Sequence, residues 1–169
     1  MALSMHRVST GSFEQAIPAL AASLRKGEGY ALSRNIAPAS LLAMKLYPDM
    51  YSLAEQVWAA ARQAMWTSSV LCGEVPGDPG PVGDSFAMLY SCLDQALEHV
   101  RSYGVEDIEA TQASEVALAL PKGELRMPAE DYLLKFALPN FYFHTTAAYA
   151  ILRQCGVELN KGDFLGPLT

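Results

Sequence analysis

Apolar residues recur every three or four positions in four long stretches of the chain, and this spacing predicts four amphipathic helices with one buried face each. The first stripe, for example, contains Phe13, Ile17, Leu20 and Leu24. The four predicted helices are 9–27, 48–72, 84–104 and 139–156. Helices of this length pack as a bundle around one core, so we expect an all-α protein with a single domain over residues 1–169.

Proline, glycine and aspartate mark the ends of these helices. Pro48 and Pro139 suit the first turn of the second and last helices, and Gly156 suits the position after a helix ends. Asp84 is expected to cap the third helix. Pro18 lies inside the first stripe, so the first helix is either kinked or begins only near this proline.

Two stretches between the helices have distinct patterns. Residues 38–46 predict a short helical run before the second helix. Residues 73–84 are rich in proline and glycine and predict a loop. This loop lacks a lysine and the GxxxxGK[ST] spacing, so it does not indicate a phosphate-binding turn.

The pattern changes near the end of the chain. Residues 115–127 form two short alternating runs around Pro121-Lys122-Gly123, which predicts a small β-hairpin. A two-stranded hairpin is marginally stable alone, so it must lie against the helices. Residues 157–169 are expected to form a coil, with Phe164 and Leu165 as its anchors.

Composition narrows the class of partner. The chain is 51% hydrophobic and has a formal charge of −6, from 12 basic and 18 acidic residues with no basic cluster. Such a chain folds into a packed globule. Its net negative charge disfavours binding to nucleic acid or to an anionic membrane. We therefore expect a small molecule or another protein as partner.

Cysteines and hydropathy bear on the compartment. Cys72, Cys92 and Cys155 are an odd number, are widely spaced and form no CxxC pair, so they predict reduced thiols rather than disulfides or a zinc site. The N-terminus lacks the pattern of a secretory signal, and the most apolar tract, 136–152, is too polar to span a bilayer. These features predict a soluble cytoplasmic protein.

The most distinctive position is His144, because its helical face is otherwise apolar. Steps of three and four residues lead from His144 to Ala147, Ala148, Ile151 and Leu152, so the imidazole is expected to face inward. Three interpretations remain open. The imidazole could be a core group hydrogen-bonded to a carbonyl or a hydroxyl, a general acid or base in a metal-free cavity, or a metal ligand.

Several other side chains are candidates for the same site. The acid/base interpretation uses His144 with Tyr142 or Tyr149. Asp49 and Gln56 are seven residues apart, so they are expected on one face of the second helix, and with His144 they would form the ligand set if a metal binds. Trp58 is expected either to pack in the core or to line a ligand cavity.

The other two histidines are weaker candidates. His6 is expected before the first helix, at the surface. His99 lies off the apolar stripe of the third helix, which predicts a solvated side chain. Hydrolase and dinucleotide-binding folds are not indicated, because the chain has neither GxSxG nor GxGxxG.

Three segments carry a resemblance to a known family. MKLYPDMYSLAEQV (44–57), LLKFALPNFYFHTTAAYAILRQCGV (133–157) and KGDFLG (161–166) resemble an uncharacterised, domain-of-unknown-function branch of the DinB/YfiT-like superfamily of putative metalloenzymes. The opening LSMHRVSTGSF also resembles the start of that branch, so the likeness covers essentially the whole chain. It implies a DinB-like four-helix bundle, up-down-down-up, with a small β-hairpin before the last helix. It also implies a homodimer.

The resemblance also bears on cofactors. Better-studied members of the superfamily bind a divalent metal through one histidine on the second helix and a pair four residues apart on the last helix, and some are thiol-dependent isomerases or transferases. This chain matches one of the pair with His144, has Ala148 at the other position, and offers Asp49 or Gln56 on the second helix. We therefore expect no resident cofactor.

These observations support three functional hypotheses. The first is a small organic ligand bound in the bundle cavity and isomerised, cyclised or dehydrated by metal-independent acid/base chemistry. The second is a non-enzymatic structural or self-associating helical protein, and the third is a divalent-metal-dependent hydrolase or transferase. The residues of the first hypothesis are His144, Tyr142, Tyr149, Asp49, Gln56 and Trp58.

Overall fold

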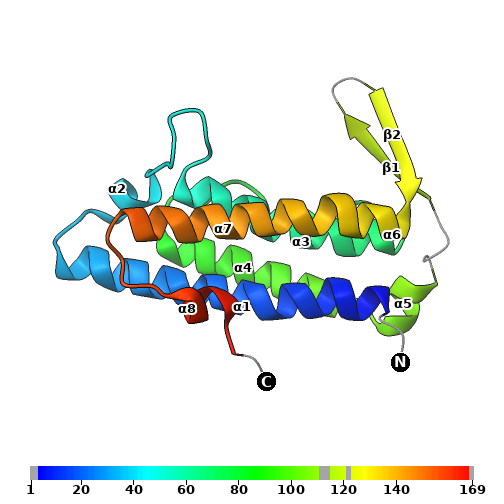
Figure 1. Ribbon diagram of the computed structural model, residues 1–169, viewed down its shortest axis with the longest axis horizontal. Helices are drawn as coiled ribbons and strands as arrows, with labels where there is room; N and C mark the ends of the chain where they lie inside the picture. Colours follow the sequence, from blue (N-terminus) through cyan, green and yellow to red (C-terminus); the bar gives the residue numbers. More distant parts are fainter. Residues whose placement is uncertain (1–3, 111–114, 121–122, 168–169) are drawn as a thin grey trace.

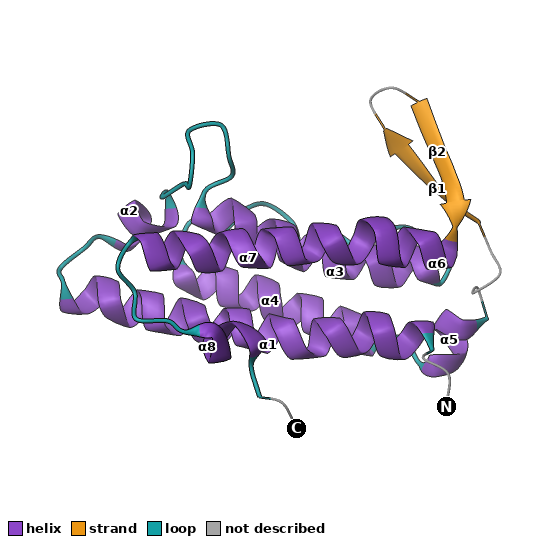
Figure 2. Cartoon of the chain, in the orientation of Figure 1, coloured by secondary structure: helices purple, strands orange, loops and turns teal. Residues whose placement is uncertain are grey.

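The computed structural model describes residues 4–110, 115–120 and 123–167 and shows a bundle of four long helices (Figure 1). The long helices are α1 (Met5–Ser33), α3 (Leu53–Leu71), α4 (Phe86–Arg101) and α7 (Leu138–Gln154). The short helices are α2 (Pro38–Leu42), α5 (Val105–Glu109), α6 (Ala129–Tyr132) and α8 (Lys161–Leu165). The strands are β1 (Glu115–Leu120) and β2 (Gly123–Pro128), which form the one sheet among the described residues (Figure 2).

The direction of the helices confirms the predicted up-down-down-up bundle. The loop after α3 runs back along the bundle. Its course is shown by the hydrogen bond from the Trp58 indole N–H, early in α3, to the carbonyl of Gly80 in the loop at 2.7 Å. Helix α4 then runs parallel to α3, so that His99 near its end meets Ser69 near the end of α3. Helix α7 returns in the direction of α1 (Figure 1).

The second long helix begins later than predicted. Ser52 caps α3, with its backbone N–H donating to the Glu55 carboxylate at 2.7 Å and its hydroxyl accepting from the Glu55 N–H at 3.4 Å. This capping box sets the start at Leu53, so Pro48 and Asp49 lie in the preceding turn. Because a serine cap at Ser85 likewise starts α4, the predicted cap at Asp84 is also wrong.

The first helix is longer than its stripe predicted. It runs through Pro18 without interruption from Met5 to Ser33, so a start near that proline is wrong. Gly27 does not end the helix but lies in its packed face. A Cβ atom built at Gly27 would lie 2.7 Å from Cδ2 of Leu152, so the glycine allows α1 to approach α7 closely.

The hairpin and the C-terminal segment show one confirmed and one wrong prediction. The strands pair antiparallel from Glu115 opposite Pro128 to Leu120 opposite Gly123, as predicted. Two residues of the predicted turn, 121 and 122, lie outside the described residues. The predicted C-terminal coil contains helix α8, capped by Asn160, and Phe164 packs edge-on against Tyr149 at 5.7 Å.

Pro139 lies in the first turn of the final helix, as predicted, but the helical stretch begins before it. Helix α6, a π-helical turn (Leu133–Ala137) and α7 follow one another without a break, and the Leu138 N–H donates to the carbonyl of Leu133, five residues back. Pro139 therefore lies near the start of α7, within the continuous stretch. Gly156 ends the helix as predicted, with φ of 96° and a Val157 N–H bond to the Leu152 carbonyl.

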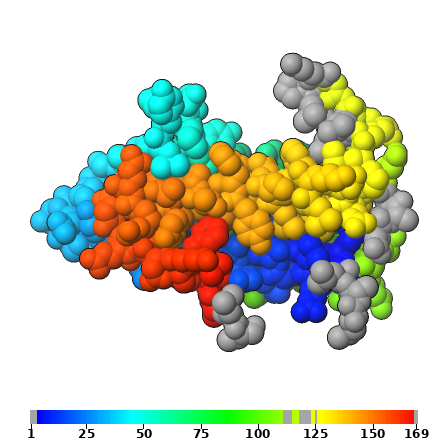
Figure 3. Space-filling view, viewed as in Figure 1, coloured from blue at the N-terminus to red at the C-terminus, as the bar shows by residue number. Residues whose placement is uncertain are grey.

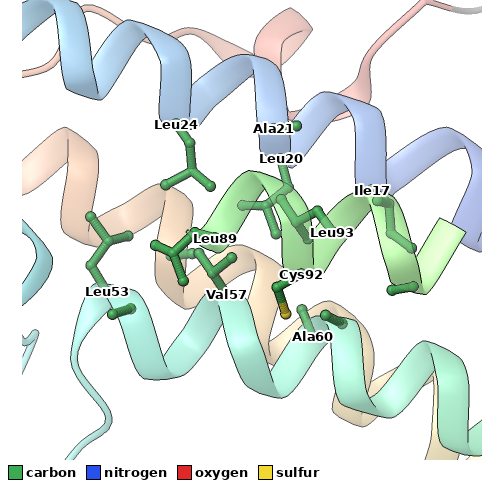
Figure 4. Packing of buried hydrophobic residues seen from close by; sticks show 14 of the residues in the cluster. Ile17, Leu20, Ala21, Leu24, Leu53, Val57, Ala60, Leu89, Cys92 and Leu93 are labelled. Carbon is green, nitrogen blue, oxygen red and sulfur yellow. The ribbon is translucent and has the colours of Figure 1, made fainter. Parts of the chain in front are cut away.

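Two apolar clusters fill the bundle. In the main cluster, residues from α1, α3 and α4 point toward one another (Figure 4), and Phe13 packs edge-on against Phe141 of α7 at 4.9 Å. The second cluster surrounds Tyr132 at the end of the bundle that carries the hairpin. None of the helices in the described part of the chain is long and apolar enough to cross a membrane.

Candidate functional site

His144 faces α3, where its partner is the amide of Gln56. The imidazole Nδ1 lies 2.8 Å from Oε1 of Gln56, and the Gln56 side chain is buried. The Gln56 amide nitrogen donates to the carbonyl of Tyr51 at 3.3 Å, which directs the amide oxygen toward the imidazole. Nδ1 therefore carries the hydrogen and donates it, and the lone pair lies on Nε2.

Two aromatic rings flank the imidazole. Tyr51 stacks on it with ring centroids 5.9 Å apart, and Phe143 meets it edge-on at 5.4 Å. Both rings are exposed over about half of their surface, and His144 itself is half-buried. Among the described residues, no side chain or backbone group donates to Nε2, which leaves this nitrogen open to a ligand.

Burial lowers the pKa of His144 below its ordinary value of 6.5. The unfolded chain therefore binds a proton at higher pH than the folded chain. As a result, the stabilisation from a neutral His144 is complete above pH 6.5 and is lost as the pH falls through the lowered pKa of the folded state. At neutral pH the folded protein holds the imidazole uncharged, the form in which it can accept a proton.

We expect His144→Gln to remove this component of the pH dependence. Urea unfolding between about pH 8 and 5 should show the wild type losing stability relative to the variant as the pH falls. His99→Gln is the matched control, since it removes a half-buried histidine from another helix. A constant difference between wild type and His144→Gln across this range would contradict the lowered pKa.

The structure does not bring the other predicted residues to His144. Asp49 is exposed in the turn before α3, so it shares no helix face with Gln56. Tyr142 is exposed, and Tyr149 packs against Phe164 of α8. Trp58 is half-buried against the loop carbonyl of Gly80.

The other two histidines also differ from expectation. His6 lies in the first turn of α1, not before it. His99 is not a simple solvated side chain, because its Nε2 lies 2.9 Å from the Ser69 hydroxyl and its ring meets Tyr103 edge-on at 5.3 Å. The Tyr103 hydroxyl in turn donates to Glu74 at 2.7 Å, so His99 belongs to a network that joins the ends of α3 and α4.

The donors around His144 do not fit a divalent metal held by three side chains. Gln56 uses its oxygen on Nδ1, Ala148 occupies the position one turn after His144, and Asp49 lies in the exposed turn. Within the described part of the chain, no three His, Cys, Asp or Glu side chains converge to hold a metal ion. We therefore assign the imidazole no metal-dependent step.

A second polar pair lies farther along the same two helices. Asn140, one turn before His144, donates to the Gln63 amide oxygen at 2.5 Å, and Gln63 is two turns after Gln56. This pair lines a hollow of about 510 Å³ between α3, the loop at 73–76, β1 and the start of α7. His144 does not line this hollow.

Several residues of these sites were missed by the sequence analysis. Tyr51 was missed because the helix was expected to start before it, and a serine cap followed by Glu three residues later could have corrected this. The one-turn spacing of Trp58, Arg62 and Trp66 could have indicated a stacked arginine. Pairing between Gln63 and Asn140 depends on the packing of α3 against α7 and has no local signal.

The fold defines a DinB-like helical bundle. The chain is similar to a crystal structure described as a DinB family member protein from Shewanella denitrificans, with a TM-score of 0.86 and 26% sequence identity. The match covers 97% of this chain and 93% of that one. A comparison with curated proteins gave no match.

Within this class, the family itself is defined by a match over residues 5–165 to the profile described as Domain of unknown function, DUF1993. The chain belongs to this family. The predicted resemblance to an uncharacterised DinB-like branch is therefore confirmed, together with its fold.

Proposed function

We propose that the protein binds a small organic molecule where α3 meets α7 and moves a proton on it through Nε2 of His144, without a metal. One observation carries this proposal. Gln56 holds the neutral imidazole in a fixed orientation by accepting from Nδ1, and the opposite nitrogen has no partner among the described residues. A positioned, uncharged imidazole of lowered pKa is suited to act as a general base.

Each neighbour has a separate role in this proposal. His144 is the catalytic residue, and Gln56 is a positioning residue that acts through it. Tyr51 and Phe143 supply flat apolar surfaces beside the imidazole ring. When a C–H bond next to a carbonyl group breaks, its electron pair moves into the carbonyl group and its proton moves to Nε2. Return of that proton to a different atom completes an isomerisation.

Nitrogen-15 NMR of histidine-labelled protein tests binding directly, because the chain has only three histidines. We expect members of a panel of small ketones, hydroxy ketones and keto acids to shift the His144 ring resonances and to leave those of His6 and His99 in place. Gln56→Leu should weaken the response, because it removes the acceptor for Nδ1–H. A panel in which no compound shifts the His144 signals would contradict the proposal.

Exposed aromatic rings favour self-association as a second candidate. Tyr47, Tyr51 and Phe143 are between 48% and 66% exposed, and two of these three rings contact His144. Aromatic side chains at the centre of an interface contribute strongly to association. Sedimentation equilibrium of the wild type and Phe143→Ser distinguishes the candidates, since a dimer that the variant dissociates supports self-association through this surface.

The thiols support a cytoplasmic setting for this function. All three cysteines are free, and burial raises the pKa of Cys72 and of Cys92 to about 11. Protonated thiols are poor nucleophiles and stay reduced most readily in the cytoplasm.

A further inference from the structure

The hollow beside Gln63 and Asn140 has the volume of a ligand site. Its volume of about 510 Å³ lies within the range of about 300–1,000 Å³ typical of small-molecule pockets. Trp66, Val70 and Phe136 form apolar surface in it, and β1 of the hairpin borders it. In Figure 3 the hairpin rises from the bundle at this end, while the segment between α2 and α3 rises at the other end of α7.

Arg62 supplies a held positive charge in the hollow. Its guanidinium carbon lies 4.4 Å from the ring centroid of Trp66 and 5.5 Å from that of Trp58. The hydrogen bond from Trp58 to Gly80 fixes the second ring. Within the described residues, Arg62 forms no ion pair or hydrogen bond. Its planar guanidinium is therefore free to donate two parallel hydrogen bonds to one carboxylate.

Negative charge lines the same hollow. Glu115 begins β1, is exposed, and makes no ion pair with any described residue. Glu74 also lines the hollow but accepts a hydrogen bond from Tyr103 at 2.7 Å. The hollow therefore presents an arginine and a carboxylate that are not paired with each other.

An unused acceptor completes the polar part of the hollow. Asn140 donates through its amide nitrogen to Gln63, and Gln63 donates to Thr67 at 3.0 Å, so the orientation of both amides is set. The carbonyl oxygen of Asn140 then has no donor among the residues that the structure describes. It can accept an N–H from a ligand.

We infer that this hollow binds a free α-amino acid with an aromatic or large apolar side chain. Arg62 takes the carboxylate, Glu115 and the Asn140 carbonyl oxygen take the ammonium group, and Trp66 with Phe136 contacts the side chain. A ligand with one charge would leave either the arginine or the glutamate without a counter-charge. The inference rests on this hollow and not on His144, so it is independent of the proposed function.

Three probes test the inference: an amino acid and two analogues that each lack one of its charged groups. They are L-phenylalanine, 3-phenylpropanoate and 2-phenylethylamine, titrated into the protein while tryptophan fluorescence is recorded. Both tryptophans of the chain contact Arg62, so the signal reports on the hollow. We expect L-phenylalanine to bind with a dissociation constant at or below about 1 mM. Each single-charge analogue should bind about ten-fold more weakly, because it loses one charge-assisted contact.

Matched variants assign the two charges. Arg62→Gln should weaken L-phenylalanine and 3-phenylpropanoate about ten-fold and leave 2-phenylethylamine unchanged, and Glu115→Gln should do the reverse for the two analogues. Arg25→Gln is the control, since Arg25 also lies over an aromatic ring, that of Tyr90, away from the hollow. Arg62→Lys serves if Arg62→Gln does not fold. Equal binding of all three probes, or no binding of L-phenylalanine, overturns the inference.

Discussion

Replacing His144 with glutamine is expected to slow carbon-bound proton exchange in a bound carbonyl compound by about 10²- to 10⁴-fold, the range typical of a general base. Glutamine keeps a polar side chain beside Gln56 but has no nitrogen that accepts a proton near neutral pH. The loss should appear in the rate and not in binding, because the base acts on the C–H bond only in the transition state.

Deuterium incorporation from heavy water, followed by proton NMR, measures this rate for carbonyl compounds that shift the His144 resonances. His99→Gln is the control and should retain the wild-type rate. Gln56→Leu should give an intermediate rate, because Nδ1 loses the acceptor that orients the imidazole. Exchange by the wild type no faster than in buffer would exclude the proposed chemistry.

Phe141→Ala is expected to lower the free energy of unfolding by about 3–5 kcal/mol. The Phe141 ring is fully buried, belongs to the main cluster and meets Phe13 of α1 edge-on, with an angle of 78° between the rings. Truncation removes this pair and leaves a cavity where α7 packs against α1. A loss of this size is a large part of the stability of a domain of this class.

Urea unfolding followed by circular dichroism measures the change, and Phe143→Ala on the same helix is the matched control. Phe143 is 55% exposed and lies outside both apolar clusters, so its truncation should cost less than about 1 kcal/mol. Similar losses for the two variants would mean that α7 does not present Phe141 to the core as described.

The sequence predicted the helices well where apolar stripes are regular and poorly where local hydrogen bonds set the ends. The stripe of α1 predicts the right face, but the sequence predicts an end at Gly27, because a glycine in a packed interface resembles a stop signal. Proline preference predicts helix starts at Pro48 and Pro139, and only Pro139 lies in a first helical turn, that of α7. Ser52 sets the start of the second helix instead, and a π-helical turn joins α7 to the helical residues before it.

The candidate site was predicted only in part. Periodicity predicts that His144 faces inward, and the seven-residue spacing from Asp49 makes Gln56 a candidate on the second helix. Their direct contact depends on how α3 packs against α7, which spacing within one helix does not determine. The same limit applies to the hollow, where Arg62 and Glu115 come from separate elements far apart in the chain.

The π-helical turn at 133–137 joins two parts of one continuous helix that face different cores. Ala129, Tyr132 and Leu133 before or within the turn belong to the second cluster, whereas Phe141 and Ala148 after it belong to the main cluster. Because a π-turn takes up one residue more than an α-turn, the helical phase of the chain shifts between the two clusters. His144 therefore owes its direction toward Gln56 to a phase that begins only after this turn, so an apolar stripe counted from the hairpin onward would misplace it.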